Sequence, residues 1–267
     1  MSSLKDIRQE YYDESARARI VLADATDAAQ RLALGHLSGP AATAALAEHL
    51  AIAAVLGAET SLPDETLILQ VQCSGPLGGI TAECTAAGTL RGFTVKKTLD
   101  EFDCLEKPDM AKLLGKRIYQ VTRSVPGRIL SQGSAASLDG YFADSLQRNA
   151  AVKSAAAVTQ EVEVLQARAV LFEIMPDSPC ADNASFAREA IANVAPSASA
   201  RTILKKLGFP NATLKRETPL AFACRCSQER AQAMFDALAP EDRAGLPDTV
   251  AVTCHMCGKS WFVTAKP

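Results

Sequence analysis

Four cysteines near the end of the chain lie in two tight pairs, which restricts what the C-terminal region can fold into. The first pair is Cys224-Arg225-Cys226 and the second is Cys254-His255-Met256-Cys257, with 27 residues between them. Each pair supplies two sulfur ligands from one local turn, so a single long-range closure brings four thiolates together. Thiolate sulfur is a soft ligand that suits tetrahedral zinc. The spacing therefore predicts one zinc ion per chain in the reduced form, with four ligands: Cys224, Cys226, Cys254 and Cys257.

Two interpretations of this cysteine cluster remain open. A closed four-cysteine site is most often a permanent structural element. The first pair has only one residue between its cysteines, however, and a disulfide across so small a ring is strained and easily reduced again. We therefore favour a reversible redox switch over a static zinc ribbon. His255 could replace one cysteine as a ligand, but four cysteines make this replacement unnecessary.

The length of the chain and the distribution of proline divide it into three parts. With 267 residues, the chain has room for one large domain and one small domain. Residues 1–175 are predicted to form an N-terminal α+β core of antiparallel sheets packed with helices. Residues 176–222 contain five prolines and many small residues, which predicts a metastable helical linker because little apolar area offsets the entropy of ordering it. An ordinary helical connector is an equally open interpretation of this segment. Residues 223–267 form the predicted small zinc-binding redox-switch domain.

Hydrophobic patterning predicts the elements within these parts. Apolar runs predict strands at residues 17–23, 67–73, 80–84, 88–96, 117–123, 129–130, 155–163, 168–175, 249–254 and 260–264. Helical spacing and capping residues predict helices at residues 27–34, 40–56, 138–149, 185–194, 199–207 and 228–238. Within the second of these helices, we expect Glu48 and His49 to lie at a solvated edge. The four cysteines without ligand spacing are expected to be buried or half-buried thiols: Cys73, Cys84, Cys104 and Cys180.

Charge and hydropathy indicate where such a protein works. The net charge of −2 supplies no field for gathering nucleic acid or an anionic membrane, so neither partner is expected. Residues 1–14 are charged and lack the apolar segment of a signal peptide. The longest apolar stretch, residues 50–58, is too short to span a bilayer. Eight cysteines without a secretory signal favour a reducing compartment, so we expect a cytoplasmic protein.

No catalytic constellation emerges from the sequence. Only three histidines are present, His36, His49 and His255, and none lies in a nucleophile motif, so we expect no enzyme and no organic cofactor. Two alternatives stay open. One is a static zinc ribbon that binds nucleic acid or a protein partner. The other is a thiol-disulfide oxidoreductase that uses Cys254 and Cys257, although such a motif usually opens a helix rather than lying in a hairpin turn.

Three segments resemble a known family. Phe222–Arg230 and Val252–Cys257 are similar to the redox-switch domain of the heat shock protein 33 family, which comprises redox-regulated holdase chaperones. Gln70–Gly79 resembles the N-terminal core of the same family, so the resemblance covers nearly the whole chain. The chain ends at Pro267, ten residues after Cys257, where members of the family usually continue. We therefore expect a less supported zinc domain.

The resemblance implies a function and a mechanism. It implies an ATP-independent holdase that is inactive while reduced and zinc-bound. Oxidation would form disulfides, release zinc and unfold the linker, after which a homodimer would hold unfolding client proteins. The nearest thiol to each cysteine is expected to be its pair partner, which predicts Cys224–Cys226 and Cys254–Cys257 disulfides, and the resemblance implies the same pairing.

Overall fold

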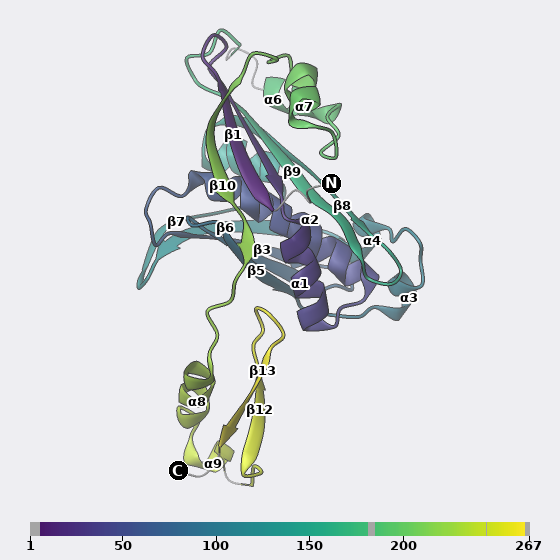
Figure 1. Ribbon diagram of the computed structural model, residues 1–267, viewed down its shortest axis with the longest axis vertical. Coiled ribbons are helices and arrows are strands. Elements are labelled where there is room, and N and C mark those ends of the chain that lie inside the picture. Colours follow the sequence, from purple (N-terminus) through teal and green to yellow (C-terminus); the bar gives the residue numbers. More distant parts are fainter. Residues whose placement is uncertain (1–5, 181–184, 244, 265–267) are drawn as a thin grey trace.

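One helix, α2 (Pro40–Leu56), lies between two sheets and organises the larger part of the molecule. The computed structural model describes residues 6–180, 185–243 and 245–264 (Figure 1). Fourteen of the 17 residues of α2 are buried, and seven of these are alanine. Because alanine side chains are small, strands from both sheets pack closely against the helix. Pro40 takes the first helical position, where a missing backbone N–H costs nothing.

The first sheet has five strands, and each neighbouring pair is antiparallel. Its spatial order is β10 (Thr213–Pro219), β1 (Ile7–Asp13), β2 (Ala18–Asp24), β9 (Val164–Ile174) and β8 (Asn149–Val158). Side chains alternate between its faces. Val21 and Leu171 join the main core around α2, whereas Ile20 and Phe172 join a second apolar cluster on the opposite face.

The second sheet has six strands. Its order is β11 (Ala221–Phe222), β5 (Thr89–Thr94), β4 (Gly79–Thr85), β3 (Thr66–Cys73), β6 (Arg117–Val125) and β7 (Arg128–Ala135). All pairs are antiparallel except that of β11 with β5, which is parallel. This short parallel pair comes directly before the first cysteine pair, so it ties the start of the C-terminal region to the core.

Shorter elements complete the fold. Those of the core are α1 (Thr26–His36), η1 (Gly57–Glu59), α3 (Asp100–Asp103), α4 (Met110–Leu114), α5 (Leu138–Gly140) and η2 (Tyr141–Ser145). Residues 176–222, the predicted linker, contain α6 (Phe186–Ala192) and α7 (Ala200–Leu207). The C-terminal region contains α8 (Gln228–Asp236), α9 (Pro240–Arg243) and a hairpin of β12 (Thr249–Thr253) and β13 (Ser260–Thr264). This region extends away from the sheets, with one end of its hairpin turned toward the core (Figure 1).

The predicted α+β class with antiparallel sheets is confirmed, but several predicted elements were wrong or missed. The helix expected at 138–149 consists only of α5 and the π-helical turn η2, and the strand expected at 155–163 is β8, which begins at Asn149. Alanine fills much of β8 and has a low strand propensity, which hides the strand. β1 was missed because Arg8 occupies a fully buried position in it, so its apolar alternation is broken.

The solvated edge expected for Glu48 and His49 does not exist. His49 is only 2% exposed, and its Nδ1 donates a hydrogen bond of 2.8 Å to the Ala45 carbonyl oxygen. Burial lowers the pKa of His49 and so favours the neutral imidazole. Glu48 is half-buried and accepts a hydrogen bond from Ser154. The prediction was wrong because both sides of α2 are covered by sheets.

The long apolar run around α2 was also underestimated. Pro40–Glu59 forms a 20-residue run that is long and apolar enough to cross a membrane by length and composition alone. The apolar stretch predicted from the sequence, residues 50–58, covers only the second half of this run. In the structure, 89% of the apolar window is buried inside the protein, as in the core helix of a globular domain.

The linker packs better than its composition indicated. Both expected helices are present, and α7 buries an apolar face made of Ile203, Leu204 and Leu207. This face belongs to the second apolar cluster, which also contains Phe172 of β9. The linker then continues as the unpredicted strand β10, which pairs with β1 along six residues while most of its own side chains stay exposed. The linker is therefore partly a β-strand, and its helix α7 packs an apolar face on the first sheet.

We expect Ile203→Ala to loosen the linker on the core. Ile203 is 2% exposed, and loss of a buried isoleucine side chain costs about 2–5 kcal/mol. Amide hydrogen exchange along α7 should accelerate in this variant, while exchange in β3 and β6 stays unchanged. Lys206→Ala, on the exposed side of the same helix, is the matched control and should exchange like the wild type. Unchanged exchange in Ile203→Ala would contradict the packing role.

Candidate metal centre

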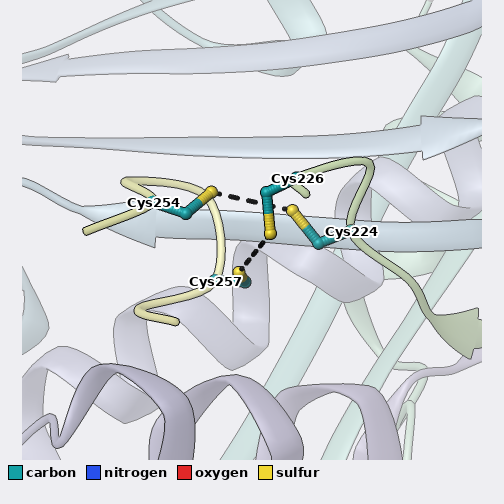
Figure 2. Close-up of side chains that lie close together, drawn as sticks. All are labelled: Cys224, Cys226, Cys254 and Cys257. Carbon is teal, nitrogen blue, oxygen red and sulfur yellow. Dashed lines mark hydrogen bonds between the residues drawn. The ribbon is translucent and has the colours of Figure 1, made fainter. Parts of the chain in front are cut away.

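Two short segments of the chain carry the four cysteines, and we refer to them as the first knuckle (Cys224–Cys226) and the second knuckle (Cys254–Cys257). The first knuckle follows β11 directly, and the second connects β12 to β13. In the second knuckle, the Gly258 N–H donates to the Cys254 carbonyl oxygen at 2.8 Å, and the Cys254 N–H donates to that of Lys259 at 2.9 Å. These bonds close the turn and direct both of its sulfurs toward the first knuckle (Figure 2).

The four sulfurs form one compact cluster. All four lie within 4.8 Å of one another, with Cys224 Sγ 3.7 Å from Cys254 Sγ and Cys226 Sγ 3.5 Å from Cys257 Sγ (Figure 2). A tetrahedron with zinc–sulfur bonds of about 2.3 Å has sulfur–sulfur edges of about 3.8 Å. The observed separations match these edges and are much longer than a disulfide bond of about 2.05 Å. The cluster therefore fits a tetrahedral metal ion such as zinc.

The protein environment shifts the pKa values of the cluster thiols in different directions. Burial raises the pKa of the Cys224 thiol, but hydrogen bonds from the Cys226 backbone and from the other three thiols outweigh it and lower that pKa to about 7. Burial raises the pKa of Cys254 and that of Cys257. Without a cation, negative charge is therefore favoured at Cys224 and disfavoured at Cys254 and Cys257, so four thiolates at one position require a cationic ligand.

The other candidate residues lie outside the cluster. Among the described residues, the four cysteines are the only group of three or more metal-ligating side chains. His255 instead packs its ring against Phe93 in an edge-to-face contact at 6.0 Å. Cys84 is buried beside Arg8, and Cys73 and Cys180 are half-buried, as expected. Cys104 is exposed, so the expectation of a buried thiol was wrong for that residue.

Small molecules have access to the cluster. A groove of about 390 Å³ is lined by Cys226 and Cys254 together with Arg91, Arg225 and Trp261. A second hollow of about 580 Å³ reaches Cys254 from the side of α1 and Phe93. Cys224, Cys226 and Cys254 are thus half-buried, whereas Cys257 is buried, so an oxidant of the size of peroxide has access to the cluster through the first three.

Sequence reasoning missed the core residues that hold the knuckles. The Arg91 guanidinium donates to Cys224 Sγ at 4.0 Å, and the Gly92 N–H donates to the Met256 carbonyl oxygen at 3.3 Å. A Cβ on Gly258, which has a φ of +73°, would overlap the Gly35 carbonyl oxygen. No spacing rule connects these residues with the cysteines, because they meet only after the sheet has formed.

Comparison with known proteins shows which family this chain resembles. The family model described as Hsp33 protein matches residues 6–264. The chain belongs to the Hsp33 family. Among curated relatives named 33 kDa chaperonin, one from Thermus thermophilus is 30% identical and aligns over 90% of this chain and 79% of its own length. That of Symbiobacterium thermophilum is 28% identical over 83% and 82% of the two chains. Hsp33 membership thus confirms the resemblance carried by the two knuckles.

A solved structure shares the fold. The Hsp33 homologue of Thermotoga maritima, described as a 33 kDa chaperonin, superposes with a TM-score of 0.86 at 17% sequence identity. The match covers 98% of this chain and 96% of that chain. The arrangement of two sheets, linker and C-terminal hairpin is thus a family fold.

We expect Gly258→Ala to undock the second knuckle. An alanine there meets both an unfavourable left-handed backbone, which costs about 1–2 kcal/mol, and the carbonyl of Gly35. The readout is amide exchange at Gly92, whose N–H is protected by Met256. Gly127→Ala is the control, because its φ is +78° but nothing lies within 4 Å of the added Cβ. Equal effects of the two variants on Gly92 exchange would rule out the docking role.

Metal removal should unfold the C-terminal region but spare the core. Within the described residues 223–243 and 245–264, the buried apolar cluster of that region consists of Ala231, Phe235 and Val263, too few residues to hold a fold without a metal. Trp261 is the only tryptophan, so its fluorescence reports on this region alone. Chelation under reducing conditions should shift Trp261 emission to the red, while the circular dichroism of the core persists. An unchanged emission spectrum after complete metal loss would show that the sulfurs are dispensable for the fold.

Proposed function

We propose that this protein is a redox-regulated, ATP-independent holdase chaperone that binds unfolding proteins and prevents their aggregation. The observation that carries the proposal is the tetrahedral, accessible four-sulfur cluster, which is docked on the core directly after the linker. Membership of a family whose relatives are named 33 kDa chaperonin supports a chaperone function. It also fits a protein that binds other proteins rather than catalysing a reaction.

In the reduced state, the proposed role of Cys224, Cys226, Cys254 and Cys257 is to hold one zinc ion. Zinc would keep the sulfurs as thiolates and connect the two knuckles. Structural zinc contributes roughly 10–16 kcal/mol of apparent binding free energy in small modules, and whole domains are stable by about 5–15 kcal/mol. Because the C-terminal apolar cluster is small, this coordination would supply most of the stability of residues 223–267.

The proposed trigger is oxidation of the sulfurs. Peroxide oxidises one thiolate to a sulfenic acid and is itself reduced to hydroxide. A second thiolate then attacks the sulfenic sulfur, which forms the disulfide and expels the sulfenic oxygen as hydroxide, and protonation of the two hydroxides gives water. We propose the pairs Cys224–Cys226 and Cys254–Cys257, as the resemblance implies. In the tetrahedral cluster, sulfurs of different knuckles also lie close together, so proximity alone does not select a pairing.

Loss of the cluster is proposed to release the linker. The parallel pairing of β11 with β5 is only two residues long, and β10 is held by β1 with few buried side chains. A released linker would expose the apolar face of the first sheet, including Ile20, Leu22 and Phe172. We propose this face and the linker itself as the surface for unfolded clients, with a homodimer as the active form and the cytoplasm as its location.

The alternative functions have less support. A nucleic-acid-binding ribbon needs free cations, whereas Arg91 and Arg225 beside the cluster both pair with Glu83. An oxidoreductase of the usual kind places its cysteine motif at a helix start, whereas Cys254 and Cys257 lie in the turn of a hairpin.

Light scattering of a heat-unfolding client tests the proposal. We expect the peroxide-treated protein to suppress aggregation and to release about one zinc per chain to a chelating dye, as one four-cysteine site requires. The reduced, zinc-loaded protein should give no protection. Cys104→Ser, which removes the exposed thiol outside the cluster, should behave like the wild type. Retention of zinc after oxidation, or aggregation unaffected by the oxidised protein, would refute the switch.

A further inference from the structure

Strand β5 contacts the linker and both knuckles through consecutive residues. Thr89 and Leu90 pair with Ala221 and Phe222 of β11. The next residue, Arg91, donates to Cys224 Sγ, and the backbone N–H of Gly92 donates to the Met256 carbonyl oxygen. One short stretch of the core sheet therefore meets the end of the linker, the first knuckle and the second knuckle in turn.

The side chains of β5 divide between the two faces of its sheet. Leu90, Gly92 and Thr94 are buried toward the core, and Gly92 lies against Leu46 of α2. Arg91 and Phe93 face the other way, Arg91 toward Cys224 and Phe93 toward His255. The outward face of β5 thus contacts both knuckles.

Glu83 fixes the position of Arg91. The two residues are register partners on β4 and β5, and Arg91 Nε lies 2.6 Å from Glu83 Oε2. The same carboxylate oxygen accepts a hydrogen bond from Arg225 of the first knuckle at 3.2 Å. Arg91 and Glu83 have side chains only 16% and 10% exposed, whereas Arg225 is 52% exposed. The charge of Arg91 is consequently less screened by water than that of Arg225.

A tetrathiolate centre holding a divalent cation carries a net charge of −2, which a nearby buried cation stabilises. Hydrogen bonds and positive charge next to a metal-bound sulfur also withdraw electron density from it, which lowers its nucleophilicity toward an oxidant. Arg91 is a cation supplied by the core rather than by either knuckle. The contact of Arg91 with Cys224 Sγ therefore exists only while the first knuckle is docked on the core, so undocking would change the reactivity of the sulfurs.

We infer that Arg91, oriented by Glu83, is a positioning residue of the metal centre that sets how tightly the metal is held and how readily the sulfurs are oxidised. Because Thr89 and Leu90 precede Arg91 on β5 and pair with β11, loss of the Arg91 contact on oxidation or metal loss would also weaken the pairing that holds the end of the linker. This inference rests on the proposed function, because it assumes that the cluster binds zinc and is oxidised.

The test compares two arginine variants that change the charge equally. In reduced full-length protein, Arg91→Gln should weaken zinc binding by about tenfold or more in competition with a chromophoric chelator, the range typical of residues that support metal ligands. Under excess peroxide it should release zinc faster than the wild type. Arg225→Gln, which loses an exposed partner of the same carboxylate, should change both quantities by less than about threefold.

Two further variants separate position from charge. Glu83→Gln keeps the Arg91 charge but removes its anchor, so it should shift zinc affinity in the same direction as Arg91→Gln and by a smaller factor. Arg91→Lys keeps a cation and should recover part of the affinity. Amide exchange at Phe222 and Ala223 should accelerate in Arg91→Gln, since Ala223 donates to the Leu90 carbonyl oxygen at 3.1 Å.

The outcomes distinguish this inference from the proposed function. If wild-type protein binds zinc and becomes a holdase on oxidation, yet Arg91→Gln matches Arg225→Gln in zinc affinity and release rate, the inference fails and the function stands. If the wild type binds no zinc, both fail. A selective effect of Arg91→Gln on zinc affinity supports the inference without any measurement of chaperone activity.

Discussion

Closure of four sulfurs into one cluster is the constraint on which the C-terminal region depends. Among the described residues of that region, its own apolar cluster contains three buried side chains, whereas the core and linker bury two large clusters on either side of the first sheet. Hydrophobic burial stabilises the core end of the molecule, whereas the C-terminal end brings four sulfurs together and has a small apolar cluster. Under the proposed zinc coordination, a reagent that acts on sulfur would disrupt one end and leave the other intact.

The core has interactions of its own that keep it folded when the C-terminal region is disrupted. A largely buried ion network joins one end of strands β2, β9 and β8 of its first sheet to η1, the turn after α2, through Arg19, Arg148, Glu59 and Glu173. Burial lowers the pKa of the Arg148 guanidinium, but its hydrogen bonds and charge interactions with both carboxylates outweigh this and raise the pKa. Removing one member would leave an uncompensated buried charge, so the network resists piecemeal opening.

The four-sulfur cluster could be predicted from the sequence because each knuckle is local and only one long-range closure is needed. The class of the fold followed from alternating apolar runs. The core contacts of the knuckles could not be predicted, since Glu83 and Arg91 become neighbours only through the register of β4 and β5. β1 was hidden by the buried Arg8, and β8 by its alanines. The packing of α7 was underestimated because its three apolar residues face a surface made by distant strands.

Strand β10 is the last strand of the first sheet on its side, next to β1. Only one of its seven residues, Thr218, is buried, so its attachment relies largely on backbone hydrogen bonds that any extended chain is able to make. While β10 is in place, the N–H and C=O groups on that side of β1 are occupied, so β1 offers no template to a neighbouring molecule and β10 forms the edge of the sheet. The segment therefore protects β1 from pairing with another chain. Release of β10 would leave the backbone N–H and C=O groups of β1 unpaired. Another extended chain could then pair with β1 through backbone hydrogen bonds, whatever its side-chain sequence.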